Sequence, residues 1–234
     1  MTMNIGSACF SVVIPAYNEG ETINNAILNT KRVLGNEVKI TVVDDGSLDE
    51  TSAIARHAGV KVIRHETNRG KGAAVKTGAL ECTSEWLLVL DADLSTRPDE
   101  INYFLPYLET NDILFGSRRV RGATIDVAQP WYRIKAGQLF NWLMRKASGL
   151  PFHDTQCGFK AYRMKTCRVL FEAQTIEGWS FDAELLMRAN AIGLRLREVP
   201  IAWRHVEGSR VRLWHAFQIL RDLMRLQKLI RKES

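Results

Sequence analysis

Short apolar runs alternate with amphipathic segments of helical length over the first half of the chain. Four runs predict strands, at Phe10–Ile14, Val38–Val43, Lys61–Arg64 and Trp86–Leu90. Each run precedes a segment that predicts a helix, at Glu21–Leu34, Glu50–His57, Gly72–Cys82 and Asp99–Leu108. Because strands that alternate with helices are typical of parallel sheets, the pattern predicts an α/β fold with a mostly parallel sheet flanked by helices.

The pattern changes after a fifth predicted strand, Asp112–Phe115. A long helix is expected from about Pro130 to Ser148, and a glycine-containing segment, His153–Phe159, follows it. A helix over Phe181–Ile192 and a strand over Arg195–Val199 complete the predicted elements. With 234 residues, 46% of them hydrophobic, the chain fits one domain, residues 1–210, followed by a C-terminal segment, residues 211–234.

Polar side chains follow three of the predicted strands at their carboxyl ends. The residues after these strands are Pro15 to Glu19, Asp44 with Asp45, and Asp91 with Asp93. Ligands of open α/β sheets bind at this edge, so a nucleotide-binding sheet is expected. Asp91 and Asp93 are two positions apart and can point the same way, toward one hard cation that carries phosphates. An acidic turn after a buried strand is the alternative for this pair.

The segment Asn68-Arg69-Gly70-Lys71-Gly72 precedes a predicted helix and combines two cations with two glycines. Glycines allow close approach of the backbone to a diphosphate, and a helix N-terminus favours an anion. A basic surface turn is the alternative. The segment is not a Walker loop, and no GxGxxG follows the first strand, so ATPase and dinucleotide-dehydrogenase functions are disfavoured.

Charge and cysteine content narrow the class of protein. The four cysteines, Cys9, Cys82, Cys157 and Cys167, lack metal-ligand spacing and are expected to be unpaired thiols.

No apolar run reaches the roughly 18 residues of a membrane span, and residues 1–10 do not resemble a signal peptide, so a cytoplasmic location is expected. The net charge is +6, and residues 203–234 carry most of it, with eight Lys/Arg against three Asp/Glu.

The basic tail predicts an amphipathic helix over Val211–Lys232. Its apolar residues fall on one half of the helix, and Arg221, Arg225 and Lys228 lie mostly opposite. This division is typical of a helix at a membrane interface, and a C-terminal helix packed on the sheet is the alternative. The chain has no recognised nucleic-acid-binding module, so no nucleic-acid partner is expected. The sequence does not indicate the oligomeric state.

Five motifs follow one another in a fixed order: Val13–Glu19, Val43–Ser47, Asn68–Gly72, Asp91–Asp93 and Gly116–Arg118. Together they resemble glycosyltransferase family 2, whose members have the GT-A fold. Three later motifs are similar to those of dolichyl-phosphate β-glucosyltransferases and their bacterial polyprenyl-phosphate relatives: Asp154–Lys160, Ile176–Asp182 and Glu198–Ile201. Dolichyl-phosphate mannosyltransferases share much of the pattern, so the resemblance specifies the reaction and leaves both glucose and mannose open as the sugar.

The resemblance implies a set of donor-binding residues. Those that hold the base and ribose of the nucleotide would be Pro15, Ala16, Tyr17 and Glu19, with Asp44 or Asp45. Arg69 or Lys71 would approach the base or the diphosphate, and Asp91 and Asp93 would hold Mg²⁺ or Mn²⁺ on the diphosphate.

The resemblance also implies an acceptor side. The cationic pocket for a lipid phosphate would consist of Arg118, Arg133, Arg204 and Arg210. Asp154 would lie nearest the transferred sugar, where it could accept a hydroxyl, stabilise the anomeric centre or act as a base; a turn-forming role is the alternative. Asp93, Arg118 and Arg133 complete the expected catalytic set.

The activity implied is inverting transfer of a hexose, glucose from UDP-glucose, to a polyprenyl or dolichyl phosphate at the inner face of the membrane. Transfer of mannose from GDP-mannose, or transfer to another acceptor, is the first alternative. A non-catalytic adaptor that binds sugar nucleotides is the second.

Overall fold

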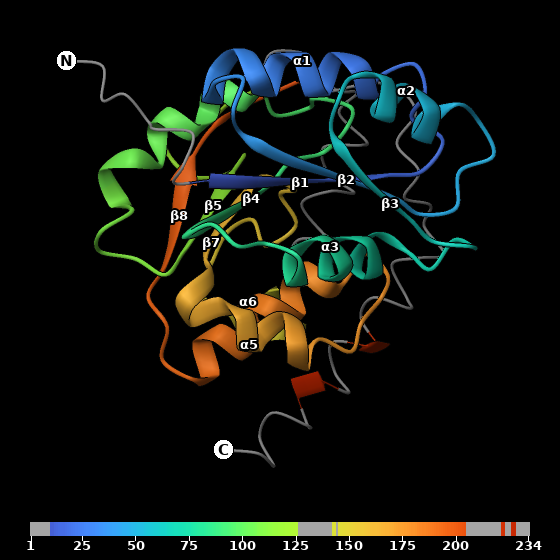
Figure 1. Ribbon diagram of the computed structural model, residues 1–234. Helices are drawn as coiled ribbons and strands as arrows, with labels where there is room; N and C mark the ends of the chain where they lie inside the picture. The colour runs from blue at the N-terminus through green and yellow to red at the C-terminus, as the bar shows by residue number, and fades with distance from the viewer. Residues whose placement is uncertain (1–9, 126–141, 144, 205–220, 223–225, 228–234) are drawn as a thin grey trace.

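The computed structural model describes residues 10–125, 142–143, 145–204, 221–222 and 226–227, and its centre is a seven-stranded sheet (Figure 1). The strands, in the spatial order β3-β2-β1-β4-β7-β5-β8, are Lys61–Arg64, Lys39–Asp44, Phe10–Ala16, Trp86–Val89, Lys160–Arg163, Ile113–Ser117 and Leu196–Pro200. All neighbours pair in parallel except β7, which is antiparallel to both β4 and β5. The prediction of a mostly parallel α/β sheet is confirmed.

Helices cover both faces of the sheet (Figure 1). One face carries α1 (Ile23–Leu34) and α2 (Thr51–His57), and the other carries α3 (Lys71–Leu80), α5 (Met164–Ala173) and α6 (Phe181–Ala191). The alternation of strand residues explains the two layers, because Val12 belongs to the core under α1 whereas Val13 belongs to the core under α3, α5 and α6.

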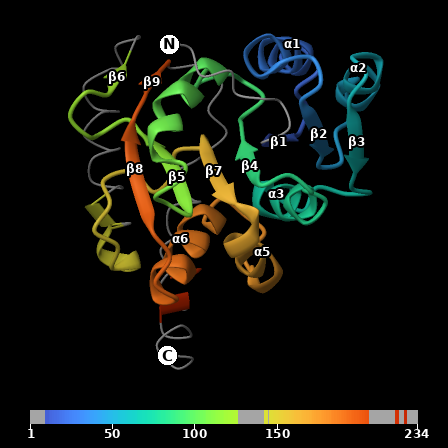
Figure 2. The ribbon, with the colours of Figure 1, turned by 60° about the vertical axis from the view of Figure 1, so that its left-hand side comes forward.

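A second, two-stranded sheet lies beside β8, at the edge of the molecule away from β3 (Figure 2). Its strands are β6 (Thr124–Ile125) and β9 (Ala202–Trp203), which pair in parallel. The pairing keeps the segment that follows β8 next to the segment that follows β5. Residues far apart in the sequence therefore meet at this edge.

The prediction of an α-helix over Asp99–Leu108 is wrong. The segment forms two 3-10 helices, Pro98–Tyr103 and Leu105–Tyr107. Pro106 has no N–H to donate, and its ring would collide with the carbonyl four residues earlier in an α-helix. The segment consequently packs on α1 as two short turns rather than one regular helix.

The sequence analysis missed β7 and α5. The strand Lys160-Ala161-Tyr162-Arg163 begins and ends with a cation, which is not typical of a strand inside a sheet. Burial of Lys160, only 1% exposed, is possible because Asp182 of α6 lies 2.7 Å from its ammonium group. The residue that allows β7 to be buried, Asp182, is therefore 22 positions away along the chain, and the local sequence of β7 does not reveal it.

Part of the predicted C-terminal architecture lies outside the described residues. The expected helix over Pro130–Ser148 is seen only at 142–143 and 145–148, and the expected tail helix only at 221–222 and 226–227. Leu226 is 4% exposed and belongs to the core under α5 and α6. In the part of the chain that is described, no helix is long and apolar enough to span a bilayer. The three described cysteines are free and buried, and Cys9 lies outside the described residues.

Candidate active site

The loops after β1 and β2 are bound to each other. The amides of Asn18, Glu19 and Gly20 donate hydrogen bonds of 2.8, 2.8 and 2.9 Å to the side chains of Ser47, Thr51 and Asp49, in that order. Asn18 has a positive φ of 51°, and its Oδ1 accepts a hydrogen bond from the amide of Leu48. Tyr17 and Glu19 of this loop, together with Pro15 and Ala16 at the end of β1, are thereby fixed against the turn that follows Asp44 and Asp45.

Asp44, at the end of β2, is completely buried. Its Oδ1 accepts the amide of Ser47 at 2.8 Å, and its Oδ2 lies 3.2 Å from Arg64 and accepts the hydroxyl of Ser52. Its side chain has no exposed surface, and the expectation that Asp44 or Asp45 holds the base and ribose stays a prediction. Asp44 holds the turn from within the protein.

Asp45 connects the end of β2 to the glycine-rich loop. It accepts the amides of Arg69 at 3.0 Å and Gly70 at 2.7 Å, and it lies 2.7 Å from Nδ1 of His65. The other ring nitrogen of His65 lies 3.0 Å from the hydroxyl of Thr77 in α3. Asp45 is 3% exposed, so its direct effect is to place the backbone of Arg69 and Gly70 at the start of α3.

The glycine-rich loop before α3 lies so close to the segment that precedes α6 that Gly70 and Gly72 leave no room for a side chain. A Cβ at Gly70, which has a φ of 112°, would lie 2.5 Å from the carbonyl oxygen of Glu177. A Cβ at Gly72 would lie 2.6 Å from the carbonyl oxygen of Ile176. Across the same contact, the side chains of Arg69 and Glu177 form an exposed ion pair of 2.5 Å. The glycine-rich loop and residues 176–178 therefore pack directly against each other and form one side of the candidate site.

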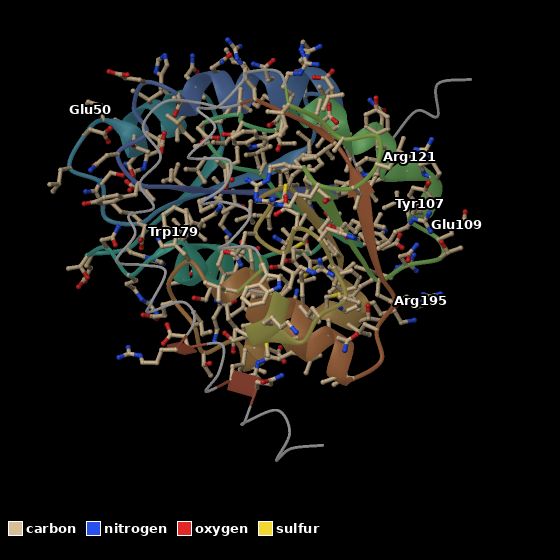
Figure 3. The ribbon with its side chains drawn as sticks, turned by 180° about the vertical axis from the view of Figure 1, so that it is seen from behind. Glu50, Tyr107, Glu109, Arg121, Trp179 and Arg195 are labelled. Carbon is tan, nitrogen blue, oxygen red and sulfur yellow. The ribbon has the colours of Figure 1, made fainter. Side chains whose placement is uncertain are left out.

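Asp91 and Lys71 meet at the carboxyl end of β4. The Lys71 ammonium lies 2.6 Å from Oδ1 of Asp91 and 5.6 Å from the centre of the Trp179 ring, beside α3 (Figure 3). Burial alone would lower the pKa of Lys71, but the charges of Asp91 and Asp182 outweigh it and raise the pKa above its ordinary value. Lys71 is thus a fixed cation at the carboxyl edge of the sheet.

Asp91 and Asp93 fit a divalent cation carried by a diphosphate. The Asp91 side chain is 32% exposed, and Asp93 is half-buried with one oxygen accepting the amide of Ser95 at 2.8 Å. Among the described residues, no three side chains of His, Cys, Asp or Glu converge into a complete metal cage. Mg²⁺ is commonly bound by one or two carboxylates together with substrate phosphates, and the pair suits that arrangement.

Gly158 makes room for the Asp91 carboxylate. A Cβ at this position would overlap Oδ2 of Asp91. Gly158 belongs to the Asp154–Lys160 motif, although the sequence analysis gave it no role. The loop that carries Asp154 therefore also packs against the expected metal ligand.

Arg118 and Asp154 form a bidentate pair in which the carboxylate is buried and the guanidinium is partly exposed. Nε and Nη2 of Arg118 lie 2.6 and 2.8 Å from the two carboxylate oxygens, and the amide of Arg118 donates a third bond of 3.1 Å. Burial alone would raise the pKa of Asp154, but the charge and hydrogen bonds of Arg118 outweigh it and hold the pKa below its usual range. Asp154 is therefore a carboxylate at neutral pH, bound to a cation.

Only two of the four expected pocket arginines lie within the described residues. The Arg118 guanidinium lies 5.4 Å from the centre of the Trp203 ring, and the next residue, Arg204, donates its amide to the carbonyl of Ser95 at 2.8 Å. This bond places the Arg204 backbone beside Ser95, which is two residues after Asp93 in the sequence. Arg133 and Arg210 lie outside the described residues, so their contribution stays a prediction.

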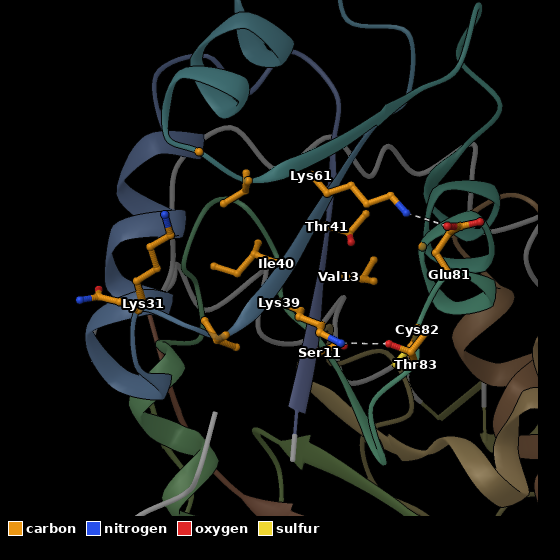
Figure 4. Close-up of a pocket in the computed structure, with 15 residues that line it drawn as sticks. Ser11, Val13, Lys31, Lys39, Ile40, Thr41, Lys61, Glu81, Cys82 and Thr83 are labelled. Atoms are coloured by element: carbon orange, nitrogen blue, oxygen red, sulfur yellow. Dashed lines mark hydrogen bonds and ion pairs between the residues drawn. The ribbon is translucent and has the colours of Figure 1, made fainter. Parts of the chain in front are cut away.

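A groove of about 460 Å³ lies elsewhere, at the amino ends of β1, β2 and β3 (Figure 4). Lys39 and Lys61 line it and are already bound to Thr83 and Glu81, at 3.2 and 2.6 Å. The residues predicted for the candidate site are at the carboxyl ends of the same strands. The groove is therefore separate from the candidate site.

Comparison with solved structures defines the class of fold. Glucosyl-3-phosphoglycerate synthase from Mycobacterium tuberculosis, in complex with Mn²⁺, UDP and glucosyl-3-phosphoglycerate, superposes with a TM-score of 0.71. The alignment covers 95% of this chain and 80% of the synthase at 19% sequence identity. The fold is that of GT-A glycosyltransferases.

Comparison of sequences defines the family. Residues 11–171 match Glycosyl transferase family 2, and the chain belongs to this family. It is 32% identical to the dolichyl-phosphate beta-glucosyltransferase of Mus musculus, over 92% of this chain and 73% of that protein. It is 31% identical to the enzyme of the same name from Saccharomyces cerevisiae, over 87% of this chain and 69% of that protein.

Proposed function

We propose that this protein is an inverting, Mg²⁺- or Mn²⁺-dependent glycosyltransferase that moves glucose from UDP-glucose to a polyprenyl or dolichyl phosphate. The observation that carries the proposal is the joint presence, at one edge of the sheet, of the Asp91–Asp93 carboxylates and the Arg118–Asp154 pair. The first pair suits a diphosphate with its metal, and the second offers a guanidinium and a carboxylate next to it. The names of the curated relatives support the choice of glucose and of a lipid phosphate.

The donor side consists of loops from β1, β2, β4 and the start of α3. The residues proposed to contact the nucleotide and its diphosphate are Pro15, Ala16, Tyr17, Glu19, Arg69, Lys71, Asp91 and Asp93. Asp45 acts by placing the amides of Arg69 and Gly70. A bound divalent cation would neutralise the leaving diphosphate, and the raised pKa of Lys71 keeps a second positive charge there.

The acceptor side consists of Arg118 and Arg204, with Arg133 and Arg210 as further proposed members. A phosphate monoester has a second pKa near about 6, so a lipid phosphate is largely a dianion at neutral pH. Such a nucleophile has little need of a general base. The main demand on the protein is to bring two anions together, and a cluster of arginines meets it.

The proposal is tested by release of UDP. The full chain with UDP-glucose and Mn²⁺ should release UDP when a polyprenyl phosphate is added, and EDTA should abolish the release. GDP-mannose in place of UDP-glucose tests the first alternative. Binding of a sugar nucleotide without turnover, with every lipid phosphate supplied, would favour the non-catalytic adaptor.

Exchange of Gly158 for alanine is expected to weaken nucleotide binding. The added Cβ would displace the Asp91 carboxylate, and Gly158→Ala should weaken Mn²⁺-dependent UDP binding at least about tenfold, or ~1.4 kcal/mol, by calorimetry. Gly193→Ala is the control, because no atom lies within 4 Å of its Cβ and it lies between α6 and β8, outside the candidate site; its φ of 74° should cost stability but not UDP affinity. Equal UDP affinity of the two variants would contradict the placement of Asp91.

We also propose that the basic tail binds the inner face of the membrane. The support is the predicted apolar half of residues 211–232, although burial of Leu226 shows that the tail also contacts the core. Each cation near an anionic surface contributes about 1 kcal/mol, so loss of two should weaken binding at least about tenfold.

The paired variant Arg225→Gln/Lys228→Gln tests the tail and leaves Leu226 in place. It should lose affinity for liposomes that contain anionic phospholipid, while UDP affinity and the melting temperature stay unchanged. Absence of liposome binding by the unmodified chain would contradict the membrane proposal. Truncation before Trp214 completes the test, since insolubility or a large loss of thermal stability would show that the tail serves mainly the core.

A further inference from the structure

The side chain of Glu198, in β8, accepts hydrogen bonds from two consecutive backbone amides, those of His153 and Asp154. Its Oε1 accepts the amide of Asp154 at 2.7 Å, and its two oxygens lie 3.1 and 3.0 Å from the amide of His153. Nδ1 of His153 lies a further 3.1 Å from Oε2. The Glu198 side chain is 8% exposed, so these contacts satisfy a carboxylate that is largely removed from water.

Two neighbouring strands thus hold Asp154 from two directions. Arg118, directly after β5, binds its carboxylate, and Glu198, inside β8, binds its amide. β5 and β8 pair in parallel with Phe115 opposite Glu198 and Ser117 opposite Pro200. Because both contacts originate from one rigid strand pair, the position of Asp154 is fixed relative to Arg118.

Glu198 does not contact the reacting groups in this arrangement. All its described bonds go to His153 and Asp154, and the donor-side loops come from β1, β2, β4 and α3. Removal of Glu198 would leave the part-buried amide of Asp154 and the exposed amide of His153 without their acceptor, so the loop at Asp154 would shift or loosen. Donor binding would change less than turnover, because Glu198 contacts no donor-side loop and the part of this loop that packs against Asp91, at Gly158, lies four residues further along.

We propose that Glu198 is a positioning residue for the transfer step, acting through Asp154. This inference rests on the proposed function and adds to it a residue that separates turnover from donor binding. A displacement of about 1 Å at a reacting group can lower a rate by about 100-fold. Glu198→Ala should therefore lower kcat roughly 10- to 100-fold and leave the KM for UDP-glucose and the Kd for UDP within about twofold.

Glu198→Gln serves as the conservative variant. Its amide oxygen can still accept the Asp154 amide, while its NH₂ group faces the His153 amide, so an intermediate loss of kcat is expected. It also keeps the test decisive if Glu198→Ala does not fold. Asp112→Asn is the matched control, because Asp112 accepts the amide of Arg195 at 3.0 Å at the opposite end of β5. That variant should lose thermal stability without loss of kcat.

Hydrogen exchange of the His153 and Asp154 amides gives a readout that does not depend on activity. Both amides should exchange faster in the Glu198 variants and at the normal rate in Asp112→Asn. A kcat within about twofold of the unmodified enzyme, or a parallel loss of kcat and UDP affinity, would overturn the positioning role. If the unmodified chain shows no transfer at all, the proposed function fails, and unchanged exchange of the two amides would then overturn the Glu198 contact itself.

Discussion

Asp93→Asn is expected to abolish transfer while the protein stays folded. Asp93 is half-buried, and its described contact is a local hydrogen bond to the amide of Ser95, which asparagine can also accept. The variant therefore loses one negative charge at the proposed metal site and little else. Charge stabilisation by a metal contributes several kcal/mol to a transition state, so turnover should fall by at least about 100-fold, or ~2.7 kcal/mol.

Two measurements check this expectation. Calorimetry should show weaker binding of UDP in the presence of Mn²⁺ and no change in its absence, and the melting temperature should stay the same. Asp99→Asn is the control, since Asp99 is a surface carboxylate paired with Arg32 at 3.0 Å. Near-normal turnover by Asp93→Asn would remove Asp93 from the proposed metal site.

Asp154→Asn is expected to slow transfer without moving its pH dependence. Arg118 holds the pKa of Asp154 below its usual range, so this carboxylate is charged throughout the neutral range and is poorly suited to take up a proton there. If the lipid phosphate attacks as a dianion, the rate should follow its ionisation near pH 6 in both proteins. A change in the acidic limb of the rate profile on mutation would instead make Asp154 the base.

The same substitution predicts a change in stability with pH. A native pKa below the unfolded value of about 3.9 gives Asp154 a stabilising effect above that pH, which is lost as the pH falls through the native pKa. At pH 7, Asp154→Asn should lower the free energy of unfolding by up to about 3 kcal/mol, because the partner guanidinium stays partly exposed to water. The difference between the two proteins should shrink in acid, which urea unfolding at several pH values would measure.

Asp112→Asn is again the matched control for Asp154→Asn. Asp112 accepts the amide, Nε and Nη2 of Arg195, the same three groups that Arg118 offers to Asp154. Arg195 lies far from Trp179, on the opposite side of the view in Figure 3. The control should lose stability but keep its turnover. Equal losses of turnover in both variants would assign the effect of Asp154 to folding alone.

The parallel half of the sheet could be predicted because its signals are local. The strands β1, β2 and β4 are short runs rich in apolar residues with polar residues close behind their carboxyl ends, and Asp91 and Asp93 are only two positions apart. Their common location then follows from the rule that ligands bind at the carboxyl edge. The motif that contains Gly70 was found for the same reason.

The contacts of the second half could not be predicted because they join distant residues. The burial of Lys160 depends on Asp182, the requirement for Gly158 depends on Asp91, and the role of Glu198 depends on the amide of Asp154. Asp44 shows the same limit, since motif resemblance does not reveal that its carboxylate is buried and bound to Arg64 and Ser52.

The pair Arg118–Asp154 joins two points that are 36 residues apart along the chain. The two ends of the stretch 119–153 therefore meet at one place, with β5 before it and the Asp154 loop after it. Parts of this stretch belong to the fold, since β6 pairs with β9 and Leu150 is buried in the core. Doubling the length of such a closed stretch adds only about 0.6 kcal/mol to the entropic cost of bringing its ends together, and neither end needs to move. The Arg118–Asp154 pair therefore tolerates a change in the length of the stretch that it closes, whereas substitutions in β6 or at Leu150 would disturb the fold directly.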